Sequence, residues 1–317
     1  MGYERREYPE KSWSVSKMDI FRDCALKYYF SVYGGWNGWE YDASERTKHI
    51  YRLTKITNMY ALSGEIIHRK IKENILGIEK KPEELFNDII TELRHLTKES
   101  FYKKEYFVSN PKKVVMLHEY YYNLYDNKDR KELAVKITER VKNSVFNLTE
   151  SETYKNLKAA NTKIIELDDE NFNYFIFDGI KIYAILDALY INSGKIFIGD
   201  WKTGKKDKEK NDLQMAVYIM YFIEKYGQKL PEIKAEDIVC LNEYINDGSS
   251  YKRNISEDEL TKTKEYIKTS EEILGRYLEN PDINKPKEEI FFKPNPGKRC
   301  SNCNFIEICD FHEIKKY

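Results

Sequence analysis

The 317-residue sequence lacks several features that would assign it to a special class of protein. No apolar run approaches the roughly 18 residues that a membrane-spanning helix needs, and the first stretch, MGYERREYPEKSW, is too polar for a secretion signal. No internal repeat or low-complexity tract occurs. We therefore expect a globular, cytoplasmic protein that does not act with a membrane.

The sequence also lacks an excess of charge of either sign. Lys and Arg together number 53, and Asp and Glu together number 53 as well, so the net charge is zero. Such a chain has no global field that attracts nucleic acid, and any anionic partner has to meet a local patch. Apolar residues make up 41% of the chain, which is enough for the core of one large domain or of two ordinary ones.

Helical patterns dominate the first half of the chain. Ser16, followed by Asp19 at the third position, predicts a capped helix that continues through FRDCALKYYF, and MYALSGEIIHRKIKENIL predicts a second helix. Between residues 81 and 157 apolar residues recur every four positions, as at Leu85 and Ile89. We interpret residues 81–157 as a helical insertion.

The second half of the chain changes character at Thr162. Short β-type runs follow, with turn residues between them: KIIEL, NYFIF, KIYAILDALYI and KIFIGDW. A helix is expected from near Asn211 to just before Gly227, then a strand in DIVCLNEYI and a helix over residues 257–279. The fold class is therefore mixed α/β.

Two aspartates stand in the apolar runs KIYAILDALYI and KIFIGDW. If Ser193 and Gly194 form a two-residue hairpin turn, counting outward places Asp187 directly opposite Asp200, and period two puts Lys202 on the same face. The rest of that face is expected to be apolar, from Ile185, Leu189, Ile196 and Ile198.

Opposed carboxylates about 5 Å apart repel each other, so the pair needs compensation. A divalent cation bound between them would supply it, and the lysine beside them would orient a water or stabilise developing negative charge. In the alternative interpretation, both aspartates lie at strand ends in solvent and pair with lysines.

The order YAILDAL then GDWKTG resembles the PD-(D/E)XK nuclease superfamily, in which an acid on one strand precedes a second acid, one intervening residue and a lysine on the next. The resemblance implies catalytic roles for Asp187, Asp200 and Lys202, and a restriction-endonuclease-like mixed central sheet flanked by helices. It extends from about Ser14 to Cys309 except for the insertion, so a single nuclease domain over residues 1–317 is expected. The usual glycine before the first acid is absent, since AILD stands there.

Two helical motifs extend the resemblance to the RecB-like branch of this superfamily. GEIIHRKI resembles the branch's helix with a metal-binding histidine, which implies that Mn²⁺ or Mg²⁺ is held by His68, Asp187, Asp200 and the main-chain carbonyl of Trp201. LQMAVYIMYF resembles the downstream Q-x-x-x-Y helix, which implies that Gln214 and Tyr218 belong to the catalytic site. Being four residues apart, they lie on one helical face, where they could meet a phosphate backbone or support the lysine. Glu166 in KIIEL is a further acidic candidate.

Three of the five cysteines form a C-x2-C-x5-C array in CSNCNFIEIC, at Cys300, Cys303 and Cys309. In a cytosolic chain such crowding argues for metal and against a disulfide framework, and a fourth ligand is needed. Cys24 and Cys240 are the candidates, and Cys240 lies in an apolar strand where a thiol packs as a small hydrophobe. His312, just beyond the array, is an alternative ligand. Four thiolates bind either tetrahedral zinc or an iron–sulfur cluster, and the spacing does not separate the two.

The stretch FRDCALKYYF resembles the upstream single-cysteine motif of iron–sulfur nucleases of the AddB type and of the CRISPR-associated RecB-like exonucleases. It implies one [4Fe–4S] cluster that joins the C-terminal region, residues 293–317, to the start of the chain through Cys24, Cys300, Cys303 and Cys309.

The activity implied is a metal-dependent exonuclease on single-stranded DNA or DNA ends. It is expected to be free-standing or to work with a separate helicase, because no G-x-x-x-x-G-K-[ST] motif occurs. One alternative is a subunit that trims spacer precursors together with a CRISPR integrase. Another is a non-catalytic DNA-end-binding protein, against which the intact D…D-x-K set argues.

Overall fold

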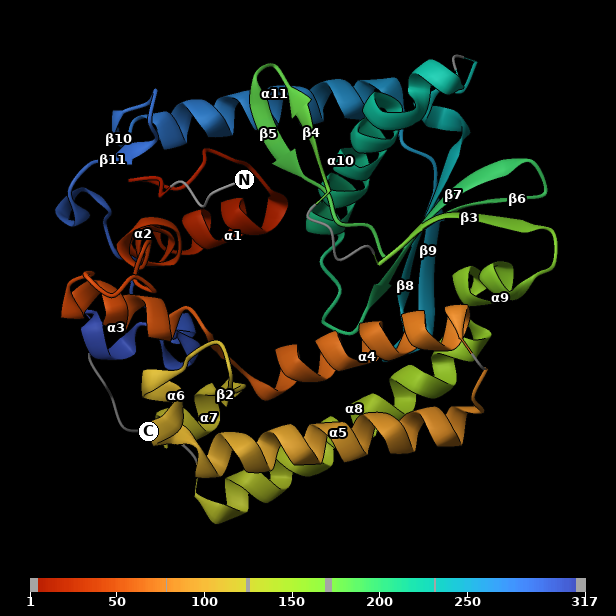
Figure 1. Cartoon of the computed structure of the whole chain (residues 1–317). Coiled ribbons are helices and arrows are strands. Elements are labelled where there is room, and N and C mark those ends of the chain that lie inside the picture. Colours follow the sequence, from red (N-terminus) through yellow and green to blue (C-terminus); the bar gives the residue numbers. More distant parts are fainter. Residues whose placement is uncertain (1–4, 78, 124–125, 169–172, 231, 312–317) are drawn as a thin grey trace. The chain divides into compact units, whose positions relative to one another are not determined.

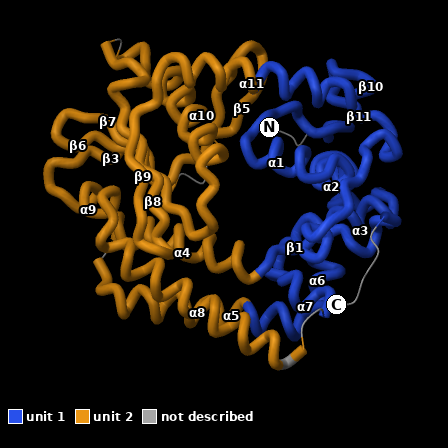
Figure 2. Tube along the Cα trace, turned by 180° about the vertical axis from the view of Figure 1, so that it is seen from behind, with its two compact units in different colours: residues 1–58, 97–124, 267–317 blue, residues 59–96, 125–266 orange. Residues whose placement is uncertain are grey.

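The computed structural model describes residues 5–77, 79–123, 126–168, 173–230 and 232–311. The chain forms two compact units, shown in different colours in Figure 2. We call one of them the sheet unit, which contains Met59–Leu96 and Tyr125–Tyr266. The other is the cysteine unit, which contains Met1–Asn58, Thr97–Leu124 and Ile267–Tyr317. Helices α5 (Pro82–Tyr102) and α11 (Glu257–Gly275) each include one boundary between the units.

A five-stranded mixed sheet lies at the centre of the sheet unit, in the order β3-β6-β7-β8-β9 (Figure 1). Neighbouring strands are antiparallel except β7 and β8, which are parallel. The mixed α/β class predicted from the sequence is confirmed. The five strands are β3 (Thr162–Leu167), β6 (Ala188–Asn192), β7 (Lys195–Lys202), β8 (Ile238–Tyr244) and β9 (Ser249–Arg253).

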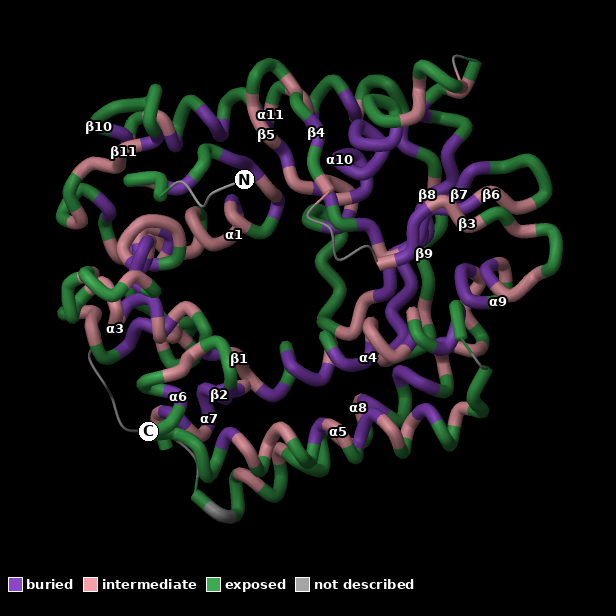
Figure 3. Tube along the Cα trace, in the orientation of Figure 1, coloured by how far each residue is buried: buried purple, intermediate pink, exposed green. Residues whose placement is uncertain are grey.

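The two faces of this sheet are covered by different helices. On one face, a Cβ atom at Gly199 would lie 2.5 Å from the Thr153 side chain of helix α9 (Glu152–Lys158), so only glycine lets that helix approach so closely. On the other face, Lys202 contacts helix α10 (Lys208–Tyr226) through Gln214. Strands β7 and β8 are therefore buried over nearly their whole length (Figure 3).

The sheet unit contains further helices and a separate two-stranded hairpin. These elements are α4 (Met59–Leu76), α8 (Asn127–Glu150), β4 (Tyr174–Phe177), β5 (Ile180–Tyr183), and the 3₁₀ turns η2 (Gly227–Lys229) and η3 (Ala235–Asp237). Helix α4 coincides with the predicted MYALSGEIIHRKIKENIL, and α10 ends at Tyr226, directly before Gly227 as expected, although it begins at Lys208 and not at Asn211. The run KIYAILDALYI is divided, because β5 ends at Tyr183 and β6 begins only at Ala188.

The cysteine unit consists mainly of short helices. Strand β1 pairs in parallel with β2, and β10 pairs in antiparallel with β11. Its elements are α1 (Val15–Asp23), α2 (Ala25–Tyr29), the π-helix η1 (Phe30–Gly34), α3 (Glu45–Leu53), β1 (Ile56–Thr57), α6 (Lys104–Ser109), β2 (Met116–Leu117), α7 (His118–Tyr121), β10 (Leu278–Asn280), β11 (Lys285–Pro286), and the 3₁₀ turns η4 (Glu289–Phe291), η5 (Lys298–Asn302) and η6 (Ile306–Ile308). Among the helices that the structure describes, none has the length and apolarity of a membrane span.

The first helix begins and ends differently from the sequence prediction. Its N-cap is Ser14, whose hydroxyl accepts the main-chain N–H of Lys17 at 3.2 Å, and Ser16 already lies inside the helix. The helix ends at Asp23, because Cys24 adopts an extended conformation with φ −166° and ψ 113°. Cys24 then caps α2, so the helix predicted to run through FRDCALKYYF is broken at the cysteine.

Candidate functional site

The hairpin that carries the two aspartates has the predicted register. Its turn is formed by Ser193 and Gly194 with positive φ angles of 49° and 78°, the left-handed conformation that a two-residue hairpin turn requires. The ladder runs from Asn192 opposite Lys195 to Ala188 opposite Gly199. The next residues outward are Asp187 and Asp200, so the two carboxylates lie on adjacent arms at the same end of the hairpin.

Asp187 lies just outside strand β6 and is held from three directions. Its Oδ2 accepts the main-chain N–H of Trp201 at 2.8 Å, and its Oδ1 lies 3.2 Å from Nδ1 of His68. Its main-chain carbonyl accepts the N–H of Asp168 at 2.9 Å. These contacts tie the first acid to strand β7, to helix α4 and to the end of β3.

Asp200 is only 2% exposed and forms an ion pair with Lys202 over 2.8 Å. Its Oδ2 is also 3.4 Å from the amide nitrogen of Asn242 on β8. The lysine Nζ donates to Oε1 of Gln214 at 2.6 Å, and Gln214 in turn donates to the hydroxyl of Tyr218. A buried charge requires such partners, so this chain of hydrogen bonds fixes the ammonium group beside the carboxylate.

Burial and charge shift the pKa values at this site in different directions. Burial raises the pKa of Asp200, with the charge of Asp187 adding to the rise, although Lys202 acts against it. The pKa of Asp187 is lowered, because His68 and Lys202 outweigh its burial. The pKa of His68 is raised to about 9, since Asp187, Asp200 and Asp168 outweigh the burial that would lower it. The first acid is therefore the one that stays ionised most readily.

Helix α4 brings His68 to the hairpin because it passes close to the end of β7. A Cβ atom at Gly64 would lie 3.0 Å from Oγ1 of Thr203, so the glycine in GEIIHRKI leaves room for this approach. His68 follows one turn later, on the same side of the helix. The motif thus combines a packing position with a polar side chain directed at Asp187.

The structure brings six predicted residues together, the two acids among them: His68, Asp187, Asp200, Lys202, Gln214 and Tyr218. Among the described residues, no three His, Cys, Asp or Glu side chains are placed so that they would hold one metal ion. At this site His68 and Asp187 pair with each other, and Asp200 pairs with Lys202. The main chain of Trp201 enters the site through its N–H.

Glu166, the additional acidic candidate, serves another purpose. Its Oε1 accepts the hydroxyl of Tyr221 at 2.8 Å, the hydroxyl of Tyr226 at 2.5 Å and Nζ of Lys225 at 3.0 Å. Its Oε2 accepts from Asn173 at 3.2 Å. A carboxylate with four donors fixes helix α10 to strand β3 and leaves little capacity for a metal ion.

Asp168 is the acidic neighbour that the sequence patterns missed. It has φ of +39°, an uncommon conformation for a residue other than glycine, and its carbonyl accepts Nζ of Lys72 at 2.6 Å. Its charge helps to raise the pKa of His68. No motif marks it, but it directly follows a predicted strand at the end where Asp187 lies.

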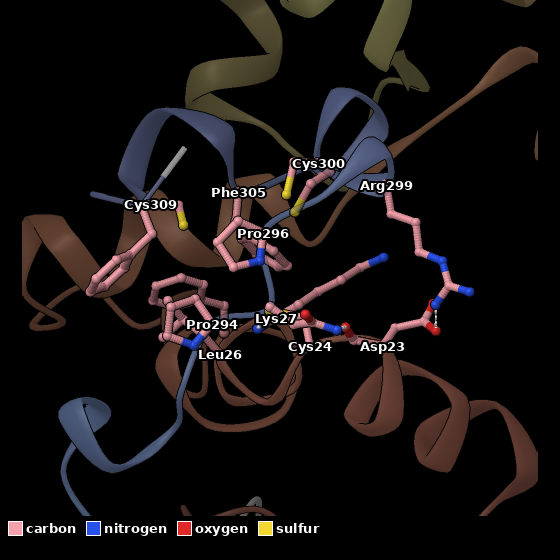
Figure 4. A pocket seen from close by; sticks show the side chains of 14 residues that line it. Asp23, Cys24, Leu26, Lys27, Pro294, Pro296, Arg299, Cys300, Phe305 and Cys309 are labelled. Carbon is pink, nitrogen blue, oxygen red and sulfur yellow. Dashed lines mark hydrogen bonds and ion pairs between the residues drawn. The ribbon is translucent and has the colours of Figure 1, made fainter. Parts of the chain in front are cut away.

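The four cysteines singled out from the sequence line one pocket in the cysteine unit. Figure 4 shows Cys24, Cys300 and Cys309 around it, and Cys303 completes the set. Apolar side chains form most of the remaining wall: Leu26, Phe30, Pro294, Pro296, Phe305 and Phe311. Burial raises the pKa of Cys303 and Cys309, and the neighbouring thiols Cys24 and Cys300 raise it further. All five cysteines are unpaired thiols.

Cys240 is not among the residues that line this pocket. It lies on β8 in the sheet unit, is fully buried, and its pKa is raised to about 12 by burial. The other alternative ligand, His312, lies outside the described residues.

The loop between Cys303 and Cys309 is held by the segment around α7. Tyr122 donates its hydroxyl to the carbonyl of Asn304 at 2.6 Å, and Tyr121 donates to Oε1 of Glu307 at 2.8 Å. His118 Nε2 lies 3.3 Å from the carbonyl of Cys303. We call His118, Tyr121 and Tyr122 the loop clasp; no sequence motif indicated it, because it comes from the middle of the predicted helical insertion.

Comparisons with known proteins identify the family of the chain. The model of the PD-(D/E)XK nuclease superfamily matches residues 12–310 of the chain. The crystal structure of SSO0001 is similar at 14% sequence identity, covers 79% of this chain and 96% of its own, and gives a TM-score of 0.30. No curated protein matches the chain.

Proposed function

Because the chain belongs to the PD-(D/E)XK nuclease superfamily, we propose that it is a metal-dependent deoxyribonuclease that acts as an exonuclease on single-stranded DNA or DNA ends. Membership itself implies a nucleic-acid substrate, hydrolysis of phosphodiester bonds and the use of divalent metal ions. The observation that carries the proposal is the Asp200–Lys202 ion pair beside Asp187, because it joins two acids and a fixed ammonium group at one point.

The side chains at this point suit a small divalent cation. His68, Asp187 and Asp200 would hold Mg²⁺ or Mn²⁺ together with the carbonyl of Trp201, once the His68–Asp187 and Asp200–Lys202 contacts open. When bound, the metal ion would stabilise negative charge on the scissile phosphate.

Lys202 has the role closest to the chemistry. Hydrolysis joins a water oxygen to phosphorus and breaks the bond from phosphorus to the bridging oxygen. An ammonium group fixed by Gln214 can orient that water or donate a hydrogen bond to a phosphate oxygen as its charge grows. Tyr218 acts through Gln214, so it is a positioning residue.

The four cysteines that line the cysteine pocket support the proposal of an iron–sulfur cluster there, although the thiols are not yet gathered closely enough to share one metal ion. Four thiols line one pocket whose other lining residues are mostly apolar, with Asp23, Lys27 and Arg299 at its charged side, and a largely apolar shell of this kind suits a thiolate-bound cluster. We propose a [4Fe–4S] cluster held by Cys24, Cys300, Cys303 and Cys309. Its role would be structural, because these ligands are distant in sequence from Asp187 and Asp200. Trimming of spacer precursors with a CRISPR integrase, work with a helicase partner, and non-catalytic DNA-end binding remain predictions from the sequence resemblance.

The test is digestion of end-labelled single-stranded and duplex DNA by protein purified without oxygen, with Mg²⁺ and Mn²⁺ titrated separately. We expect metal-dependent cleavage by the wild type and loss of cleavage in Lys202→Met. Lys195→Met is the matched control, because Lys195 is an exposed lysine of the same strand. Equal cleavage by Lys202→Met and the wild type would place the active site elsewhere.

A further inference from the structure

The hairpin of β4 and β5 turns an aromatic face outward. Tyr174 and Ile176 are each 50% exposed, and the ladder places Tyr183 opposite Tyr174 and Lys181 opposite Ile176. Their neighbours Phe175 and Ile182 are buried at 5% and 0%. The hairpin therefore has an apolar face that packs inward and a second face, rich in tyrosine, that meets solvent.

The outward row continues beyond the hairpin to the active site. Burial alternates without interruption after β5: Ile182, Ala184, Leu186 and Ala188 are all 1% exposed or less. Ile185 between them is 42% exposed, although the sequence placed it on the apolar face of the catalytic hairpin. This alternation puts Tyr183, Ile185 and Asp187 on the less buried side of the segment between β5 and β6, which has no regular structure at residues 184–186 and bends at Asp187.

The inward face fixes this hairpin to the elements that build the site. The ring of Phe175 lies 6.4 Å from that of Tyr221 on α10, the helix that also carries Gln214. The N–H of Ala184 donates to the carbonyl of Asn173 at 3.0 Å, and the Asn173 amide donates to Glu166 on β3. The outward row thus has a defined position relative to Asp187.

The side chains in this row suit unpaired nucleotides. Nζ of Lys181 lies 4.1 Å from the ring centre of Tyr174 and 5.3 Å from that of Tyr183, so a cation stands beside two tyrosine rings. Bases stack on aromatic rings, and lysines attract the phosphates between the bases. In a duplex the base faces are covered by their neighbours, whereas a single strand exposes them.

We propose that Tyr174, Ile176, Lys181, Tyr183 and Ile185, here called the tyrosine row, form a stacking surface that guides single-stranded DNA to Asp187. The inference rests on the proposed nuclease function and adds the path by which the substrate reaches the site. According to this proposal, the DNA next to the reacting phosphate is bound as a single strand.

The test measures binding of a labelled oligodeoxynucleotide to the full chain in buffer without divalent metal, where cleavage is prevented. We expect Tyr174→Ala to weaken binding about tenfold, which is the size of effect that loss of one stacked base produces, and Tyr174→Phe to bind like the wild type. Phe146→Ala is the control, because Phe146 is an exposed aromatic residue on α8 in the same unit. A 2-aminopurine base near the end of the strand should be quenched on binding to the wild type and not to Tyr174→Ala.

Two results separate the inference from the function on which it rests. Unchanged binding and quenching in Tyr174→Ala, with cleavage by the wild type intact, would overturn the tyrosine row and leave the nuclease standing. Wild-type protein that cleaves only duplex DNA and does not bind the single strand would also overturn it. Absence of all nuclease activity would instead reject the proposed function. Capture of a protein by this face with no DNA binding would assign the row to a protein partner and contradict the proposal.

Discussion

The main-chain N–H of Trp201 donates to Oδ2 of Asp187 over 2.8 Å. The residue between the second acid and the lysine therefore positions the first acid on the neighbouring strand. The spacing in D-W-K explains this arrangement. Because one residue intervenes, the side chains of Asp200 and Lys202 point to the same face of the strand. The main-chain N–H of Trp201, the intervening residue, then contacts Asp187.

Loss of charge at Asp187 should remove cleavage without unfolding the site. In Asp187→Asn the remaining carbonyl oxygen can still accept the Trp201 N–H, but the anionic ligand is gone. We expect Mn²⁺-dependent cleavage to fall by about 100-fold or more, as for loss of a group that stabilises charge in the transition state, with DNA binding retained. Single-turnover rates and binding curves check this, and a variant that fails to bind DNA would contradict it.

Gln214 should affect the rate through Lys202. Gln214→Leu removes the oxygen that accepts Nζ of Lys202 at 2.6 Å, so the ammonium group loses one of its two positioning contacts. We expect a lower kcat with little change in KM, and a smaller effect than that of Lys202→Met. Tyr218→Phe should be milder still, because its hydroxyl contacts only the far side of Gln214. A change confined to KM would show that Gln214 acts on DNA binding.

Cys24 and Cys240 should respond differently to the same substitution. Protein purified without oxygen should contain about four irons per chain, and Cys24→Ala should lose both iron and thermal stability, since a cluster ligand and a long loop closure disappear together. Cys240→Ala should keep its iron and lose about 1 kcal/mol of stability from the core. One zinc per colourless chain would reject the cluster, and bleaching only in Cys240→Ala would reassign the fourth ligand.

The loop clasp should control how firmly the cluster is held. Tyr122→Phe removes the hydrogen bond to the Asn304 carbonyl, at a cost of about 1 kcal/mol, and should speed the loss of iron to a chelator. Tyr102→Phe is the control in the same unit, because Tyr102 is 76% exposed. Equal rates of iron loss in the two variants would show that the loop holds its shape without the clasp.

Glu259 should make stability depend on pH in acid. The N–H of Ser256 lowers the pKa of Glu259 to about 2, with Arg253 contributing and partial burial opposing. A carboxyl with a lowered pKa in the folded state stabilises above its unfolded pKa of about 4.5, and this contribution fades as the pH falls toward 2. Urea denaturation should therefore show the wild type more stable than Glu259→Gln at pH 7, with the difference shrinking below pH 4.5. A constant difference would exclude the charge as its cause.

The sequence predicted the parts of the structure that depend on local rules. The hairpin register followed from a two-residue turn at Ser193 and Gly194, and helix α4 followed from its apolar periodicity. Local rules misplaced the first N-cap, since Ser14 and Ser16 are both acceptable cap residues and the structure uses Ser14. They also joined β5 and β6 into one strand, because burial alternates through Ile185 even where the segment leaves the sheet.

Other parts of the site depend on contacts between distant segments. Glu166 resembled a catalytic acid in its strand, but Tyr221, Lys225 and Tyr226, which satisfy it, come from a helix more than 50 residues away. The loop clasp likewise meets the Cys303–Cys309 loop across more than 180 residues. Asp168 lies next to the site with a positive φ angle, and no rule of sequence spacing predicts such a backbone conformation.

The division of the chain between the units sets an order for its synthesis on the ribosome. Every residue of the sheet unit has been made once Tyr266 is added, whereas the cysteine unit still awaits its third segment, including Cys300, Cys303 and Cys309. The sheet unit can therefore begin to fold while Cys24 and the loop clasp still lack their partners. Assembly of the proposed cluster would then be among the last steps in maturation, and a chain that ends at Tyr266 would carry His68, Asp187, Asp200 and Lys202 without the three C-terminal cysteines.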